Sequence, residues 1–227
     1  MKNYLIGLIL LSSIQFATAQ NELSVDYGEI KKTVENKESE YFYPKLLQRF
    51  NNFDESLTLE EYALIYYGFS FQDDYIKNQP DERILSEIMK DEDYNKLIVE
   101  CENILKRNPV SLKANDCMGY ALFKLNKPES EWKKYQNRFR GLRKAIVYSG
   151  NGLSCETSFK VIYVSDEYSV LYDYFEISEI YSQALTEDFC DKFEIKPSNY
   201  YQVKEVYFDI SRKLIRQQEL MDSLPPL

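Results

Sequence analysis

The sequence predicts an α+β protein in which the helices come first and the strands follow. Residues 21–149 keep their apolar side chains at the three- and four-residue spacing of helices, whereas residues 150–227 mostly alternate apolar and polar side chains as strands do. The glycine-containing stretch SGNG, residues 149–152, separates the two regions. Runs of helices followed by runs of strands are typical of α+β folds, and short connections favour an antiparallel β-meander.

The first twenty residues, MKNYLIGLILLSSIQFATAQ, have the layout of a cleaved secretory signal peptide. Lys2 gives a positive start, residues 4–11 form an apolar run, and Ala17 and Ala19 place small side chains at the −3 and −1 positions of a cleavage site. The run is shorter than the roughly 20 residues of a membrane-spanning helix. We therefore expect residues 1–20 to be removed on export, the alternative being a buried N-terminal helix.

The helices of residues 21–149 are placed by the residues that begin and end them. Two short helices are expected at residues 27–34 and 41–50. A third begins after Thr58, which with Glu61 has the spacing of a capping box, and continues to about Phe71. The remaining helices are expected at residues 83–89, 94–107, 112–125 and 129–148.

Residues 94–128 predict two helices joined by a turn so short that they must lie antiparallel. Their apolar and small residues lie at the offsets of tetratricopeptide repeats: Leu97, Cys101, Ile104 and Pro109, then Met118, Gly119 and Leu122. The stretch therefore resembles a degenerate tetratricopeptide hairpin, in which Asn115 replaces the usual tryptophan. The resemblance implies repeat-like helices that present a groove to a protein or peptide, or that serve only as a scaffold for the sheet.

Residues 150–227 are expected to form an antiparallel sheet with a short C-terminal helix. The stretch TSFKVIYVSDEYSVLYDYFEI, residues 157–177, predicts two strands around a turn at residues 165–167. Residues 177–185 could be a further strand or a bent continuation. The later elements are a strand at FCDKFEI, residues 189–195, a strand at VKEVYFDIS, residues 203–211, and a closing helix at residues 211–224.

Five stretches carry a resemblance that spans nearly all of the chain after the expected signal. They are EYALIYYGFSFQDDY, ANDCMGYALFKL, VIYVSDEYSVL, FCDKFEI and VYFDIS. With these stretches the chain resembles an uncharacterised family of secreted Bacteroidota proteins, domain of unknown function 4919. The resemblance implies a helical N-terminal part, a β-rich C-terminal part and export, and it implies no activity.

Composition excludes several classes of function. The chain has 28 basic and 37 acidic residues and a formal net charge of −9, and removal of Lys2 with the signal brings this to −10. Such a charge opposes binding to nucleic acid or to anionic membrane surfaces and favours solubility. The sequence has no histidine, no CxxC pair and neither glycine-rich phosphate-binding motif. We therefore expect no cofactor, no zinc site and no histidine-activated nucleophile.

All four cysteines follow the expected signal, and an oxidising compartment would permit disulfides. Cys101 and Cys117 lie eight residues either side of Pro109, so an antiparallel hairpin would bring them level. We expect them either to form a disulfide or to remain as two buried thiols. Cys155 and Cys190 could pair only if the first and third strands lie close together.

Twenty tyrosines are the most unusual feature of the composition. On the expected second strand Tyr168, Tyr172 and Tyr174 share one face. That face could be a packing layer with its hydroxyls at the rim, or an exposed surface that binds a peptide or a glycan.

Carboxylates are the catalytic groups that the sequence leaves open, since a glycoside hydrolase needs two of them about 5 to 10 Å apart. The candidate pairs are Asp166 with Glu167, Asp173 with Glu176, and Asp188 with Asp191. Each pair also fits a turn or a solvated strand edge. We therefore expect an exported, non-enzymatic protein- or peptide-interaction module, periplasmic or extracellular. The alternative is a carbohydrate-binding or carboxylate-dependent carbohydrate-active protein.

Overall fold

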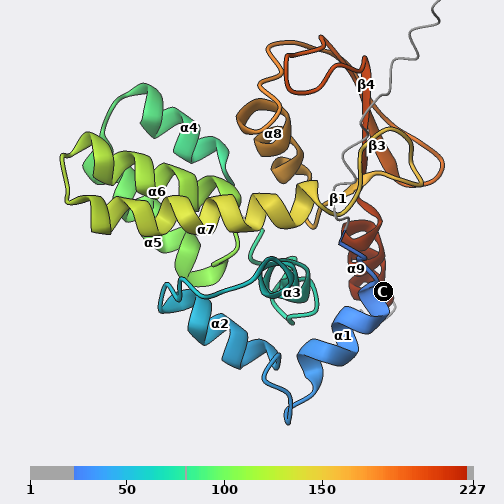
Figure 1. Ribbon diagram of the computed structural model, residues 1–227, viewed down its shortest axis with the longest axis horizontal. Coiled ribbons are helices and arrows are strands. Elements are labelled where there is room, and N and C mark those ends of the chain that lie inside the picture. The colour runs from blue at the N-terminus through green and yellow to red at the C-terminus, as the bar shows by residue number, and fades with distance from the viewer. Residues whose placement is uncertain (1–22, 80, 224–227) are drawn as a thin grey trace, which may run out of the picture.

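The computed structural model describes residues 23–79 and 81–223 and confirms the α+β fold (Figure 1). The predicted signal segment, residues 1–20, lies outside the described residues. The helices are α1 (Tyr27–Glu35), α2 (Tyr43–Asn51), α3 (Leu59–Phe69), α4 (Arg83–Lys90), α5 (Tyr94–Arg107), α6 (Leu112–Lys124), α7 (Glu129–Val147), α8 (Val164–Asp173) and α9 (Ser211–Asp222). The strands are β1 (Phe159–Lys160), β2 (Ile180–Leu185), β3 (Cys190–Ile195) and β4 (Glu205–Asp209).

The capping box predicted at the start of α3 is present. The Thr58 hydroxyl accepts a hydrogen bond from the backbone N–H of Glu61 at 3.2 Å, and the Glu61 carboxylate accepts one from the N–H of Thr58 at 2.8 Å. Two N–H groups that the first turn leaves free are thereby satisfied. This start fixes the register of α3, which then buries Ile65, Tyr66 and Tyr67.

Helices α4 to α7 follow one another through short connections and pack as consecutive neighbours, α4 on α5, α5 on α6 and α6 on α7 (Figure 1). Such short turns make successive helices antiparallel. An apolar cluster that includes Leu85, Leu97 and Met118 lies between the first three of them. Helix α7 is the longest and also packs on α3, α8 and β1, so it joins the hairpins to the sheet.

The sheet has the strand order β1-β4-β3-β2. Strands β2, β3 and β4 form the expected antiparallel meander, and the two-residue β1 is added in parallel to β4, with Phe159 beside Phe208. Strand β3 buries Cys190, Phe193 and Ile195. Strand β2 lies at the edge of the sheet, and all its residues except Ile180 are exposed.

The prediction of a strand over the second half of residues 157–177 is wrong, because most of these residues form helix α8. The residues that α8 buries include Asp166, Glu167, Val170 and Leu171, which recur at the three- and four-residue spacing of a helix. Asp166 and Glu167 lie in its first turn, where the helix dipole favours acidic side chains. The strand that pairs with β3 comes instead from residues 177–185, which the sequence left open.

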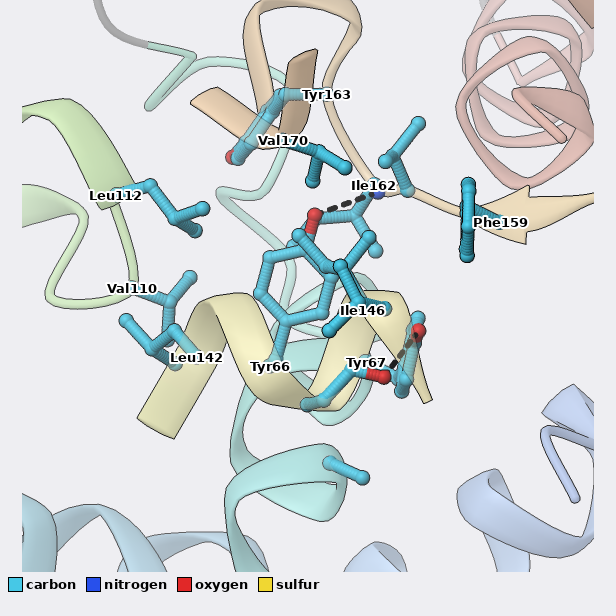
Figure 2. Close-up of a cluster of buried hydrophobic side chains, with 14 of the residues drawn as sticks. Tyr66, Tyr67, Val110, Leu112, Leu142, Ile146, Phe159, Ile162, Tyr163 and Val170 are labelled. Atoms are coloured by element: carbon cyan, nitrogen blue, oxygen red, sulfur yellow. Dashed lines mark hydrogen bonds between the residues drawn. The ribbon is translucent and has the colours of Figure 1, made fainter. Parts of the chain in front are cut away.

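Buried tyrosines join the helical region to the segment that carries β1 and α8 (Figure 2). The Tyr66 hydroxyl donates to Oδ2 of Asp166 at 2.6 Å and accepts from the backbone N–H of Ile162 at 3.1 Å. Tyr75 donates to the carbonyl of Ile162, and Tyr163 donates to the carbonyl of Tyr75 at 3.0 Å. These tyrosines pack in the core, and each hydroxyl has a hydrogen-bond partner there.

The structure decides between the cysteine pairings that the sequence left open. Cys155, before β1, and Cys190, at the start of β3, form a disulfide with their Cα atoms 5.8 Å apart. Cys101 and Cys117 are two buried free thiols, which is the second of the two alternatives that the sequence left open. The neighbouring thiol of Cys117, followed by burial, raises the pKa of Cys101 and so disfavours its thiolate.

Under denaturing conditions without reductant, we expect alkylation to label two thiols, and to label four after reduction. Replacing the bridge in the double variant Cys155→Ser/Cys190→Ser should lower the free energy of unfolding by about 4 kcal/mol, because the bridge closes a loop of 35 residues. Intact mass and urea unfolding measure the two effects. Four labelled thiols before reduction would contradict the pairing.

A glycine in the middle of α7 gives a second test. Replacing an exposed glycine within a helix by alanine usually raises the free energy of unfolding by about 1 kcal/mol. A Cβ at Gly141, however, would overlap the Tyr62 ring. Gly141→Ala should therefore lower the free energy of unfolding by about 1 to 3 kcal/mol in urea unfolding. Gly28→Ala in α1, where the new Cβ would lie 3.1 Å from a carboxylate oxygen of Asp26, is the control and should be nearly neutral.

Candidate functional site

Helices α4, α6 and α8, whose places in the fold Figure 1 shows, contribute the residues that line a cleft of about 410 Å³. Helices α5 and α7 contribute no residue to it. Seven of the nine lining side chains are polar or charged and the other two are tyrosines. They are Glu82, Arg83 and Ser86 at the start of α4, Lys113 in α6, and Ser165, Tyr168, Ser169, Tyr172 and Asp173 in α8.

Tyr168 and Tyr172 form the aromatic wall of this cleft. They lie one helical turn apart on α8, and their rings stack with centroids 6.1 Å apart and an angle of 27° between planes. The Tyr168 hydroxyl donates to Oε1 of Gln183 at 2.7 Å, and the ring packs edge-on against Phe193. Tyr172 is 48% exposed. The sheet therefore fixes one tyrosine and leaves the other available to a ligand.

Tyr174, predicted to share their face, lies elsewhere. Residues two apart share a face on a strand but not on a helix, and Tyr174 is the C-cap of α8. Its ring packs against Phe175 and lies 5.2 Å from the Arg143 guanidinium. It lines a different cavity of about 670 Å³. The predicted three-residue binding face is thus reduced to the pair Tyr168 and Tyr172.

The acidic residues at this cleft are shifted toward their neutral forms. Oε1 of Glu82 accepts a hydrogen bond from the hydroxyl of Ser111, the N-cap of α6, at 3.1 Å. Burial raises the pKa of Glu82. Behind it Asp166 is 1% exposed, and burial, followed by the charge of Glu82, raises its pKa as well. The carboxylates therefore add less negative charge to the cleft than their number implies.

A second pair of carboxylates lies deeper, between α8 and β3. Glu167 is fully buried, and no hydrogen-bond donor reaches either of its carboxylate oxygens. Asp191 accepts from Nε2 of Gln183 at 2.9 Å. Burial, followed by the charges of Asp191 and Asp166, raises the pKa of Glu167 well above its ordinary value, and Lys213 only partly offsets this. Its surroundings therefore favour the neutral, protonated form of Glu167.

The structure does not bring any predicted carboxylate pair together on the cleft. Asp166 and Glu167 are buried behind it, and Asp173 lines it without Glu176. In the third pair Asp188 is exposed whereas Asp191 is buried. Within residues 23–79 and 81–223, no three acidic or cysteine side chains are placed to hold a metal ion. What the cleft offers is ring stacking and hydrogen bonding to a ligand.

Six cleft residues were not predicted from the sequence: Glu82, Arg83 and Ser86 at the start of α4, Lys113 in α6, and Ser165 and Ser169 in α8. The positions of α4 and α6 were predicted, but their approach to α8 was not. The helical spacing of Val164, Tyr168 and Leu171 was the signal that could have revealed α8 and paired Tyr168 with Tyr172.

In comparison with known proteins, one family model, described as Domain of unknown function (DUF4919), matches residues 28–219. The chain matches none of the curated proteins and none of the solved structures with which it was compared. The part of the chain that the structure describes contains no helix long and apolar enough to span a bilayer.

The burial of Glu167 leads us to expect that the free energy of unfolding falls as the pH rises. The pKa of Glu167 is higher in the folded protein than in the unfolded chain. Its protonated form therefore contributes fully to the free energy of unfolding below the unfolded-state pKa of about 4.3, and this contribution is lost as the pH rises through the folded-state pKa. Glu167→Gln, which cannot ionise, should raise the free energy of unfolding at about pH 8 by roughly 1 to 3 kcal/mol and flatten its pH dependence.

Urea unfolding at about pH 5 and pH 8 measures this difference. Glu156→Gln changes an exposed carboxylate and is the control, with no expected effect. A Glu167→Gln variant that loses stability between the two pH values as steeply as the wild type would contradict the role of this acid.

Proposed function

This chain belongs to the DUF4919 family, and on that premise we propose that it is an exported, non-enzymatic module that binds a peptide segment of a partner protein. The observation that carries the proposal is the α4–α6–α8 cleft, which stands open and exposes Tyr172 on its wall. Exposed aromatic side chains beside polar groups are characteristic of protein interaction sites.

The arrangement of the helices supports a repeat-like origin for the cleft. The pairs α4–α5 and α6–α7 are consecutive hairpins in the region where the sequence has tetratricopeptide-like spacing. Only the first helix of each pair, α4 or α6, contributes residues to the cleft. Helices α4 and α6 therefore form one continuous wall. Helix α8, not the sheet, forms the opposite wall. Stacked helix pairs of this kind present their concave side to partners.

The chemistry of the cleft suits a peptide without a large net charge. It has two acidic residues, Glu82 and Asp173, and two basic residues, Arg83 and Lys113. Arg83 is already paired with Asp81 at 2.8 Å. Serine hydroxyls and charged groups can bond the amides and carbonyls of an extended backbone, while Tyr172 stacks on an apolar side chain.

Two observations support export. The first twenty residues have the signal layout, and the described chain contains a disulfide between Cys155 and Cys190. Disulfides persist in oxidising compartments and are rare in the cytosol. We therefore place the protein in the periplasm or outside the cell, as for the secreted Bacteroidota proteins that the sequence resembles.

Carbohydrate binding is the second candidate, and the stacked pair Tyr168 and Tyr172 is the observation that favours it. A tyrosine platform bordered by hydroxyl and carboxylate groups can hold a sugar ring as well as a peptide side chain. Carboxylate-dependent cleavage has less support, because none of the three carboxylate pairs lies together on the cleft.

Selection from a random peptide display library, followed by fluorescence anisotropy with the selected peptide, tests the peptide proposal. Tyr172→Ala should weaken binding at least tenfold, since a central aromatic side chain is worth about 2 kcal/mol or more. Tyr41→Ala, which removes another exposed tyrosine in the α1–α2 connection, should leave binding unchanged. Circular dichroism confirms that both variants are folded.

Peptides that bind Tyr172→Ala as tightly as the wild type would overturn this assignment of the site. A glycan array supplies the competing result, because sugar binding that is lost in Tyr172→Ala, with no peptide selected, would favour the carbohydrate candidate instead.

A further inference from the structure

A second groove, of about 740 Å³, lies along α7 where that helix faces the connection between α2 and α3. It shares no lining residue with the α4–α6–α8 cleft. One wall is apolar and aromatic, and the other is a row of basic side chains. The apolar wall includes Phe53, Leu57, Leu59 and Tyr62, and the basic wall consists of Lys134, Arg138, Arg140 and Lys144.

Arg138 is the central basic group and is only 6% exposed. Its Nε and Nη2 donate to the carbonyl of Phe50 at 3.1 and 2.6 Å, and its guanidinium lies 3.5 Å from the centre of the Phe53 ring. Burial lowers the pKa of Arg138 to about 10, so it stays charged at neutral pH. Within the described chain it has no carboxylate partner at salt-bridge distance, so this charge is compensated only by a carbonyl and by aromatic rings.

The other bases of this groove also have no carboxylate at salt-bridge distance among the described residues, although the chain carries more acids than bases. Lys133, the neighbour of Lys134, shows the contrast, because it pairs with Glu129 at 2.9 Å. Two acidic residues also line the groove, Asp54 and Glu55. Asp54 already forms a salt bridge with Arg49 at 2.7 Å, so only Glu55 is left to offset the basic side chains of the groove. A net positive groove on a net negative protein is a specific feature and not the average of its surface.

We propose that the α7 groove binds an acidic, partly apolar peptide segment of a partner protein. Its acidic side chains would pair with Lys134 and Lys144, and the buried charge of Arg138 would add to the positive potential between them. Its apolar side chains would cover Leu57 and Tyr62. An inorganic anion would use the bases but leave the apolar wall exposed to water. This is a second contact, chemically distinct from the neutral cleft, and it does not depend on that assignment.

The groove is already formed in the unbound chain. The Phe53 ring lies between two bases of the groove, with the Arg138 guanidinium 3.5 Å and the Lys134 ammonium 4.5 Å from its centre. At Gly141 the missing side chain lets Tyr62 approach α7 closely. Side chains held in this way lose little further freedom when a ligand binds, which favours affinity.

The probe is a fluorescein-labelled peptide of alternating glutamate, leucine and phenylalanine. Its control is the same peptide with lysine in place of glutamate. Fluorescence anisotropy measures the binding of each peptide to the disulfide-intact protein. The acidic peptide should bind, the basic one should not, and binding should weaken from roughly 20 to 200 mM salt. Lys134→Glu or Lys144→Glu should each weaken binding about five- to tenfold. Lys133→Glu is the matched control, with the same charge change on the same helix, and should have at most a twofold effect.

Equal losses in Lys134→Glu and Lys133→Glu would overturn the proposal, because the effect would then be one of overall charge. So would binding of a sulfated polysaccharide without binding of the acidic peptide. Tyr172→Ala should leave the acidic peptide bound, and this separates failure of the α7 groove from failure of the α4–α6–α8 cleft.

Discussion

The contact on which the rest of the structure depends is the one between the Tyr66 hydroxyl, the Asp166 carboxylate and the backbone N–H of Ile162. It joins α3 to the first turn of α8, segments about a hundred residues apart in the sequence. Asp166 is buried, and without this donor its carboxyl would carry an uncompensated desolvation cost. Because α8 is the far wall of the cleft, a hydrogen bond in the core sets the position of a surface site.

Helix α7 separates two surfaces with different chemistry. On one side α6 and α8 pack against it and border the neutral, tyrosine-lined cleft. On the other its own side chains form the basic wall opposite Leu57 and Tyr62. Both surfaces use rigid helices and aromatic rings already held in place, as expected for binding sites that form before a ligand arrives. A partner that presents a neutral and an acidic segment could reach both.

Local features were predictable from the sequence, and long-range ones were not. The Thr58–Glu61 capping box and the helices up to α7 follow from residues a few positions apart. Helix α8 was missed because its valines and tyrosines also fit a strand, and because Asp166 and Glu167 indicate a turn unless one knows that tertiary contacts bury them. The disulfide and the cleft depend on which segments meet across the fold, and no local pattern encodes that.

The edge strand β2 has a consequence for how the molecules behave toward one another. Its six residues, IYSQAL, include no charge and no proline, so its open backbone could pair with that of a second molecule. Acidic residues flank it, Glu179 before the strand and Glu187 and Asp188 after it. Two such edges aligned antiparallel would bring these carboxylates together. Repulsion between these ends would therefore oppose pairing of two β2 edges, and acid or high salt would weaken that repulsion.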